Sequence, residues 1–358
     1  MHLEKGLPPA DYIRYTRRRS FAVTACFAIL LLLIPVSLSL GAVKIPFSDV
    51  LEALFTRNGT LQTRMIILNI RLPQVIAAAT AGAGLSIAGA VMQSVLRNPL
   101  GSPYTLGISS AAAFGAAFAV MVLSSGAMQS TAADPITVTS PYLTTLWAFL
   151  ACSLAAGIIL AVSRSRASSP ETMILTGVAL GSLFTAGTMV LQYFADDTQL
   201  AAMVFWTFGD LARASWREVL FISSSTVLAL VYFILNRWNY NGIDSGDETA
   251  AGLGIHVKAV RLTGMVVGSL VTAVIISFVG VIGFVGLVCP HIARRMVGGD
   301  HRFLLPASIA LGGILLLVSD TAARLVLAPR VLPVSIITAF TGAPVFILLL
   351  IRGHRKWN

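Results

Sequence analysis

Long apolar runs, separated by short polar segments, set the pattern of this chain. A helix needs about 20 apolar residues to cross a bilayer, because every backbone N–H and C=O must be hydrogen-bonded within the segment. Runs of about this length occur ten times. We therefore expect an all-α polytopic membrane protein, whose ten transmembrane helices cover residues 21–40, 75–95, 107–123, 143–162, 173–194, 219–235, 262–281, 282–297, 304–327 and 334–351.

The eighth run, residues 282–297, is the weakest of the ten. It is short, it meets the seventh run through Gly280 and Gly283, and it contains Pro290 and His291. Proline and glycine interrupt the hydrogen-bond ladder of a helix. A broken or half-buried helix is expected there.

Basic residues are distributed unevenly between the two sides of the predicted membrane domain. With 56% hydrophobic and 11% charged residues and a mean hydropathy of +0.84, the chain is too apolar for an ordinary soluble protein. Of its 25 Lys and Arg residues, 17 fall on the side that carries both termini. The positive-inside rule places that side in the cytoplasm. The formal charge of +10 is thus a consequence of topology and requires no nucleic-acid partner.

We expect one membrane domain, residues 21–352, between a cytoplasmic N-terminal segment (1–20) and a cytoplasmic tail (353–358). Arg18 and Arg19 resemble a twin-arginine export signal, but nine further apolar runs follow, so the first run is interpreted as a retained span.

Two polar segments within this domain differ from the other connections. Residues 196–208, on the outer side, suit a short interfacial helix. In residues 239–258, on the inner side, acidic residues follow Gly246 as they do at a helix start, and Gly252 and Gly254 suit its end.

The chain lacks the common nucleotide and zinc motifs. No Gly-Lys pair occurs, which excludes a Walker A loop, and there is no H-E-x-x-H sequence. The three cysteines lie inside apolar runs without paired spacing, which does not predict a disulfide or a zinc site. We expect no metal or cofactor on this chain.

A few ionisable residues lie within the spans, where they are costly and are by default functional candidates. Asp320 and Arg324 stand at i and i+4, an order that favours a helical ion pair, and the alternative is a proton or sodium relay. His291 is interpreted as an interfacial residue beside the Pro290 kink. Metal ligation by His291 would need partner ligands that the sequence does not supply.

Short motifs recur at the ends of the predicted spans, from about Ile45 to Arg352. They are Arg71-Leu72-Pro73, Gly89-Ala90-Val91-Met92-Gln93, Arg97-Asn98-Pro99-Leu100-Gly101, Leu106-Gly107, the run from Gly283 to Pro290-His291, Asp300-His301-Arg302, Asp320 with Arg324, Leu332-Pro333 and Gly342-Ala343-Pro344-Val345-Phe346. In this order and at these positions they resemble the FecCD-type permeases, the transmembrane subunits of ABC importers for iron-siderophore complexes, haem and vitamin B12.

The resemblance implies a type II ABC importer permease fold in the plasma (inner) membrane of a prokaryote. It implies a homodimer or close heterodimer, with the substrate path along the subunit interface. Two cytoplasmic ATP-binding subunits would carry ATP and Mg, in agreement with the missing Walker motif, and an extracytoplasmic substrate-binding protein would dock outside. Gates would lie on the fifth and tenth spans and on residues 196–208.

The resemblance also assigns residues. The coupling helices that contact the ATPase would include Gly246, Asp247, Glu248, Thr249, Ala250, Leu253 and Gly254. Arg71 and Arg324 would receive acidic side chains of the binding protein, while Gln74 stands where many relatives have a second arginine. The remaining motif residues are expected to be structural: Gln93, Asn98, Pro99, Gly107, Gly283, Gly286, Pro290, His291, Asp320, Pro333, Gly342 and Pro344.

Ferric siderophore is the first substrate expected, with haem, cobalamin and oxyanions as alternatives. The competing class is an ion-coupled secondary transporter in which Asp320 carries the proton. A membrane enzyme is a third class, but the sequence offers no paired carboxylates and no nucleophile with a base at one depth.

Overall fold

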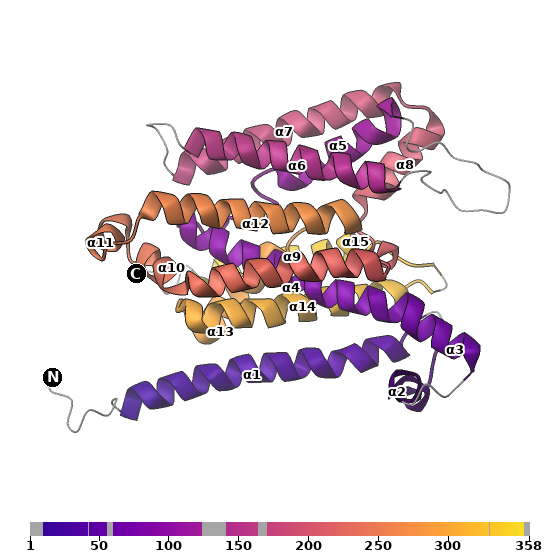
Figure 1. Ribbon diagram of the computed structural model, residues 1–358, viewed down its shortest axis with the longest axis horizontal. Coiled ribbons are helices and arrows are strands. Elements are labelled where there is room, and N and C mark those ends of the chain that lie inside the picture. The colour runs from indigo at the N-terminus through magenta and orange to yellow at the C-terminus, as the bar shows by residue number, and fades with distance from the viewer. Residues whose placement is uncertain are drawn as a thin grey trace.

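The computed structural model describes residues 10–41, 43–55, 60–123, 141–163, 170–328 and 330–353, and the statements below concern these residues. The predictions for residues 1–9 and 354–358 lie outside the described residues. Every regular element in the described part is a helix, as the sequence predicted. In Figure 1 the long helices run side by side along the longest axis of the molecule.

The helices follow the predicted runs and add short ones between them. They are α1 (Ala10–Ser39), α2 (Phe47–Phe55), α3 (Leu61–Met65), the π-helical turn η2 (Ile66–Arg71), α4 (Leu72–Val95), α5 (Ile108–Val122), α6 (Pro141–Ser163), α7 (Pro170–Phe194), α8 (Asp197–Thr207), the 3₁₀ turn η3 (Leu211–Arg213), α9 (Trp216–Leu235), α10 (Arg237–Asp244), α11 (Asp247–Gly252), α12 (Val257–Val279), α13 (Val285–Val297), α14 (His301–Leu325) and α15 (Val334–Gly353).

Seven helices in the described ranges are long and apolar enough to cross a membrane. The other three predicted spans are shorter: α5 has 15 residues, α13 has 13, and the apolar part of α15 runs from Val334 to Leu349. At 1.5 Å per residue, α13 is only about 20 Å long, against a hydrocarbon thickness of about 30 Å. The broken helix expected at the eighth run is therefore present, and the non-helical residues 280–284 precede it.

The helix that contains the second predicted span begins much earlier than the apolar run. Residues 61–95 form one continuous helical segment of 35 residues, interrupted only by the π-helical turn of η2. Pro73 explains that turn, because it donates no backbone hydrogen bond and its ring crowds the carbonyl four residues before it. The sequence predicted a membrane span over residues 75–95, and the helix that contains this span begins earlier, at Leu61.

Helix α4 is the centre of the bundle. It packs against α14, α12, α9 and α13, and 83% of the apolar window of residues 61–95 is buried inside the subunit, against 22% for α1 and α7. Small residues allow this: a Cβ at Gly82 would lie 2.2 Å from the carbonyl oxygen of Gly312. Such close backbone approach is typical of helix pairs in lipid.

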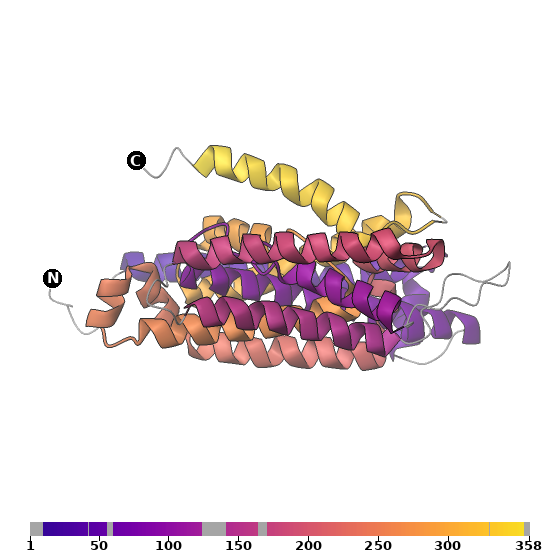
Figure 2. The same cartoon turned by 90° about the horizontal axis from the view of Figure 1, so that it is seen from above.

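The two ends of the bundle carry different short helices. Helices α10 and α11 lie at the end where α1 begins and α15 finishes, and α2, α3 and α8 lie at the opposite end (Figure 1). We call the first the inner end, because the positive-inside rule predicts that it faces the cytoplasm. Seen from above, α15 runs along one side of the bundle (Figure 2), where it contacts α14 and α13.

Substitution of Gly89 by alanine is expected to lower the free energy of unfolding by about 1–3 kcal/mol, the usual cost of overpacking. A Cβ at Gly89 would lie 1.7 Å from the carbonyl oxygen of Gly286, and backbone on both sides leaves little room to relax. Unfolding in mixed detergent micelles measures the change. The control is Gly157→Ala in α6, where a Cβ would meet no heavy atom within 4 Å. Equal losses in both variants would contradict the prediction.

Candidate functional site

The inner end carries a compact helical hairpin made of α10 and α11. Gly246, with φ of +115°, stands between the two helices, and Gly254, with φ of +81°, follows α11. These are left-handed or extended glycine conformations that other residues adopt only with strain. The predicted start and end of this inner helix agree with the structure.

The predicted coupling residues divide into two groups. Ala250 is buried, and the carboxylate of Asp247 forms an ion pair with the Arg261 guanidinium at 3.0 Å. Glu248, Thr249 and Leu253 are exposed, and Leu253 keeps 70% of its surface accessible. The first group fixes the hairpin to the bundle, whereas the second leaves an open contact surface.

A polar cluster anchors α10 to the long helices of the bundle. The His301 side chain is fully buried between Asn241 of α10 and Ser94 of α4. Asp244, at the end of α10, lies 3.4 Å from the Arg294 guanidinium of α13. Sequence reasoning placed His301 only within a motif, and assigned no role to it.

At the outer end, two buried arginines donate hydrogen bonds to backbone carbonyl oxygens at and just beyond the end of α1. Arg71 donates to the carbonyl oxygens of Leu38 at 2.7 Å and of Val43. Arg324 donates to the Leu40 carbonyl oxygen at 2.9 Å. The last carbonyl groups of a helix have no partner within the helix, and these guanidinium groups supply one.

Arg324 also pairs with Asp320, as the i, i+4 spacing predicted. The two groups are 3.1 Å apart and almost fully buried, and the second carboxylate oxygen of Asp320 accepts a hydrogen bond of 2.9 Å from the Gln74 amide. Gln74 therefore has a defined role as a neutral partner of Asp320. Docking of a binding protein on Arg71 and Arg324 remains a prediction, and in this structure both guanidinium groups are engaged in contacts within the chain.

Helix α8 occupies the predicted outer segment and, with the residues that follow it, contacts four spans. It packs against α5 and α7. Beyond its end, Asp210 N–H donates to the Val279 carbonyl oxygen of α12, and the Gly209 carbonyl oxygen accepts from the backbone of Val334 at the start of α15. A displacement of α8 would therefore be transmitted to α5, α7, α12 and α15.

The start of α8 should respond to acid. The hydroxyl of Thr198 and the backbone N–H of Gln199 donate to the Asp196 carboxylate at 2.6 and 2.7 Å, and they lower its pKa below the ordinary value of 3.8. The cap therefore stabilises α8 fully above the ordinary pKa, and the stabilisation is lost as pH falls through the lowered value. We expect the protection factors of the α8 amides, which correct exchange rates for their intrinsic pH dependence, to be constant at pH 5–7 and to fall below pH about 4. In Asp196→Asn this fall should be absent; its persistence would contradict the prediction.

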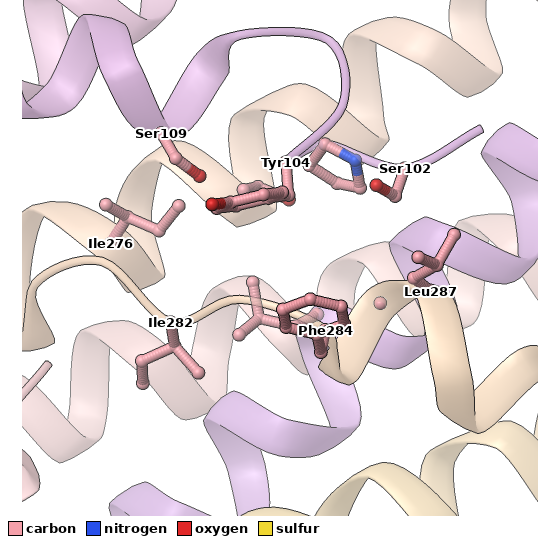
Figure 3. A pocket seen from close by; sticks show the side chains of 11 residues that line it. Ser102, Tyr104, Ser109, Ile276, Ile282, Phe284 and Leu287 are labelled. Atoms are coloured by element: carbon pink, nitrogen blue, oxygen red, sulfur yellow. The ribbon is translucent and has the colours of Figure 1, made fainter. Parts of the chain in front are cut away.

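Two non-helical segments face each other, residues 97–107 after α4 and residues 280–284 before α13. Tyr104 stacks on Phe284 with ring centroids 6.3 Å apart, and Figure 3 shows the two rings on opposite walls of a small cavity. The cavity has room for about one water molecule, and the buried Ser109 hydroxyl that lines it has no protein partner. Phe284 has a φ of +65°, a strained value that often marks functional backbone.

The remaining motif residues hold these segments in place. The Gln93 amide donates to the Leu287 carbonyl oxygen at 3.2 Å. The Asn98 side chain accepts from the Leu100 N–H at 2.8 Å and so forms a turn around Pro99. Gly107, with φ of +74°, begins α5 in contact with Gly177.

Residues 280–284 also contact Tyr104 and α15 through closely packed glycines. Gly283 lies beside Tyr104, and Gly342 lies against Phe284, where a Cβ would be 2.6 Å from the Phe284 Cβ. Pro333 precedes α15 and Pro344 lies within it. Pro290 is buried inside α13, and the His291 ring contacts Phe346 edge-on at 6.2 Å. No group of three or more His, Cys, Asp or Glu side chains in the described part could hold a metal ion.

The family model described as the FecCD transport family matches residues 29–352. The chain belongs to the FecCD transport family. FecCD relatives cover nearly its whole length. It is 47% identical to an ABC transporter permease protein of Methanocaldococcus jannaschii, over 97% of this chain and 99% of that one. It is 35% identical to the iron(3+)-hydroxamate import system permease protein FhuB of Bacillus subtilis, over 97% and 88% of the two chains.

Two further matches extend this picture. The chain is 34% identical to the hemin transport system permease protein HmuU of Yersinia pestis, over 81% of this chain and 84% of that one. A solved metal-chelate type ABC transporter in an inward-facing conformation superposes with a TM-score of 0.79 at 27% identity, and covers 92% of this chain and 98% of that chain. This FecCD protein is thus a multi-pass protein of the inner membrane with the fold of that permease.

Proposed function

We propose that this chain is the permease subunit of an ABC importer that passes a metal chelate, in the first place a ferric siderophore, from a binding protein into the cytoplasm. The observation that carries the proposal is the inner hairpin. It places Glu248, Thr249 and Leu253 on an open surface of a membrane protein whose sequence has no Walker A loop. A transporter without its own nucleotide site, but with a fixed contact surface, is suited to an ATPase partner.

ATP binding and hydrolysis on two partner subunits, which carry the ATP and Mg, would bias the permease between two states. A ligand shifts such an equilibrium only by its differential affinity for the states, so the hairpin must be held differently in each. The chain itself performs no bond chemistry in this mechanism. It supplies the path and the gates.

A second permease subunit, in the simplest case an identical copy, would complete the path. Helix α15 lies at the side of the bundle with Phe340 at 77% exposure and Ile351 at 67% (Figure 2). Most of α7 is also open, with Tyr193 at 83% exposure. These apolar faces support burial against lipid and against a second copy of the chain. The gates of the path would be formed by α7, α8 and α15.

The environment of Asp320 favours the ABC importer over an ion-coupled transporter. Its two carboxylate oxygens are occupied by Gln74 and Arg324. An ion-coupling site usually needs several converging polar groups with an accessible position for the ion. Arg324 of this ion pair also donates to carbonyl oxygens at the end of α1, which is a structural role.

Co-expression with its proposed ATPase and binding-protein partner subunits tests the proposal. The complex is reconstituted in vesicles and given ⁵⁵Fe-ferrichrome, haemin or cyanocobalamin as probes. We expect uptake only with all subunits and with ATP inside, and preference for ferrichrome over haemin and cyanocobalamin. Uptake that persists without the ATPase subunit, driven by an ion gradient, would overturn the ABC assignment. A preference for haemin or cyanocobalamin would overturn only the siderophore.

A further inference from the structure

We propose that the last turn of α4 is the joint through which both helices of the inner hairpin act on the membrane bundle. His301 connects this turn to α10, and Arg261 connects it to α11. This inference rests on the proposed function, in which the hairpin receives the ATPase. It assigns Ser94, Asn241, Arg261 and His301 as positioning residues for the coupling.

The connection to α10 runs through a buried imidazole. The Asn241 amide donates to Asp300 at 3.2 Å, which directs its oxygen toward His301. That oxygen accepts from the His301 backbone N–H and lies 2.8 Å from Nδ1. An amide oxygen only accepts, so Nδ1 carries the proton and Nε2 accepts from the Ser94 hydroxyl at 2.9 Å. His301 thus joins α10 to α4 with both ring nitrogens in use.

The same hydroxyl of Ser94 lies beside the end of α10. It is 3.3 Å from a carboxylate oxygen of Asp244, and that oxygen also accepts from Arg294 at 3.4 Å. Helix α10 is therefore held at two points, one turn apart, against α4 and α13. A helix held at two points can move only with the elements that hold it.

The connection to α11 runs through a buried guanidinium. Arg261 of α12 donates to both carboxylate oxygens of Asp247, at 3.1 and 3.0 Å, through Nη2. Its Nε donates to the Val95 carbonyl oxygen at 2.6 Å. Arg261 is only 7% exposed, so its bond to the Val95 carbonyl oxygen operates with little competition from water. The Asp247 side chain keeps 43% of its surface accessible. Asp247 is the first residue of α11, and thus the start of that helix is tied to α4.

Ser94 and Val95 are consecutive, so the two connections meet on one turn of the central helix. The chain then leaves the helix through Arg97, whose φ of +45° is one of two positive values for non-glycine residues in the described ranges. The other belongs to Phe284, which stacks on Tyr104 of the segment that Arg97 begins. Motion of the hairpin is delivered directly to the start of residues 97–107.

The experiment uses the permease with its ATPase subunits in lipid nanodiscs and compares hydrogen exchange without nucleotide and after trapping with Mg-ATP and vanadate. Ser94→Ala removes the link to α10, and Arg261→Gln removes the link to α11. Ser245→Ala is the matched control, because its hydroxyl is exposed and bonds only to the Asn241 carbonyl oxygen of its own helix. Thermal unfolding verifies that each variant is folded.

We expect vanadate trapping to change exchange in residues 97–107 of the wild type and of Ser245→Ala. In Ser94→Ala the trapping-induced change in exchange of residues 97–107 should be up to about tenfold smaller, the equivalent of one hydrogen bond. In the double variant, Ser94→Ala with Arg261→Gln, the change should be absent. In Ser245→Ala, ATP hydrolysis should stay within about twofold of the wild type, because the exposed hairpin surface is intact. A full response of residues 97–107 in folded Ser94→Ala and Arg261→Gln would overturn the joint. If the double variant does not fold, the single variants decide.

The outcome separates the joint from the proposed function. If the ATPase subunit does not bind the wild-type chain, the proposed function fails. The joint is then judged on the isolated chain, where Ser94→Ala must raise exchange of residues 237–244 by up to about tenfold over Ser245→Ala. Absence of any rise overturns the joint.

Discussion

Replacement of Arg324 by glutamine is expected to lower the free energy of unfolding by about 3–5 kcal/mol, the usual cost of removing one partner from a buried ion pair. The change leaves the carboxylate of Asp320 buried, with Gln74 as its remaining partner. It also removes the donors to the Ser37 and Leu40 carbonyl oxygens at the end of α1. An unfolding titration in mixed detergent micelles gives the value.

Two further variants serve as a control and as a rescue for Arg324→Gln. Arg217→Gln makes the same change on an exposed cation at the outer end and should stay within about 0.5 kcal/mol of the wild type. The double variant Asp320→Asn with Arg324→Gln should recover part of the loss, because no charge is left unpaired. If Arg324→Gln is no more harmful than Arg217→Gln, the ion pair does not stabilise the fold. A folded double variant that still transports with ATP would also exclude Asp320 as a proton carrier.

The inner hairpin shows what the sequence can predict. Its helix start and end were predicted from Gly246, the acids after it and the glycines that follow, because helix caps depend on residues close in the chain. The breaks before α13 were predicted for the same reason. These signals are local, and in this chain tertiary packing leaves them unchanged.

The start of the helix at Leu61 was missed because hydropathy falls over residues 61–74. A helix requires only continuous backbone hydrogen bonds, and the π-helical turn at Ile66–Arg71 maintains them past Pro73. Apolar runs define where a helix can cross lipid, and they do not define where it begins.

The partners of single polar residues were the least predictable feature. His301 contacts Asn241 and Ser94, which are 60 and 207 positions away in the chain. Arg324 reaches the carbonyl oxygen of Leu40, 284 positions away. No spacing rule predicts such pairs, because only the folded bundle brings α1, α4, α10 and α14 together.

Substitution of Leu253 by aspartate is expected to weaken binding of the ATPase subunit by at least about 30-fold, the equivalent of a hot-spot loss of 2 kcal/mol. Leu253 follows α11 at the tip of the hairpin and keeps 70% of its surface exposed, so its apolar side chain is open to a partner. An aspartate there would carry a charge into the partner's apolar contact and leave it desolvated. Binding is measured by titration of the tagged ATPase subunit against the permease in nanodiscs.

The fold should not change in this variant, because only the backbone N–H of Leu253 is used within the hairpin, in bonds to the Thr249 and Ala250 carbonyl oxygens. Leu253→Met keeps an apolar side chain of similar size and should bind within about threefold of the wild type. Equal binding of the aspartate and methionine variants would show that the tip does not contact the ATPase. Weak binding of both would indicate a contact that depends on the shape of leucine. Loss in the aspartate variant alone is the result that the exposed tip predicts, because an apolar contact tolerates methionine and rejects a charge.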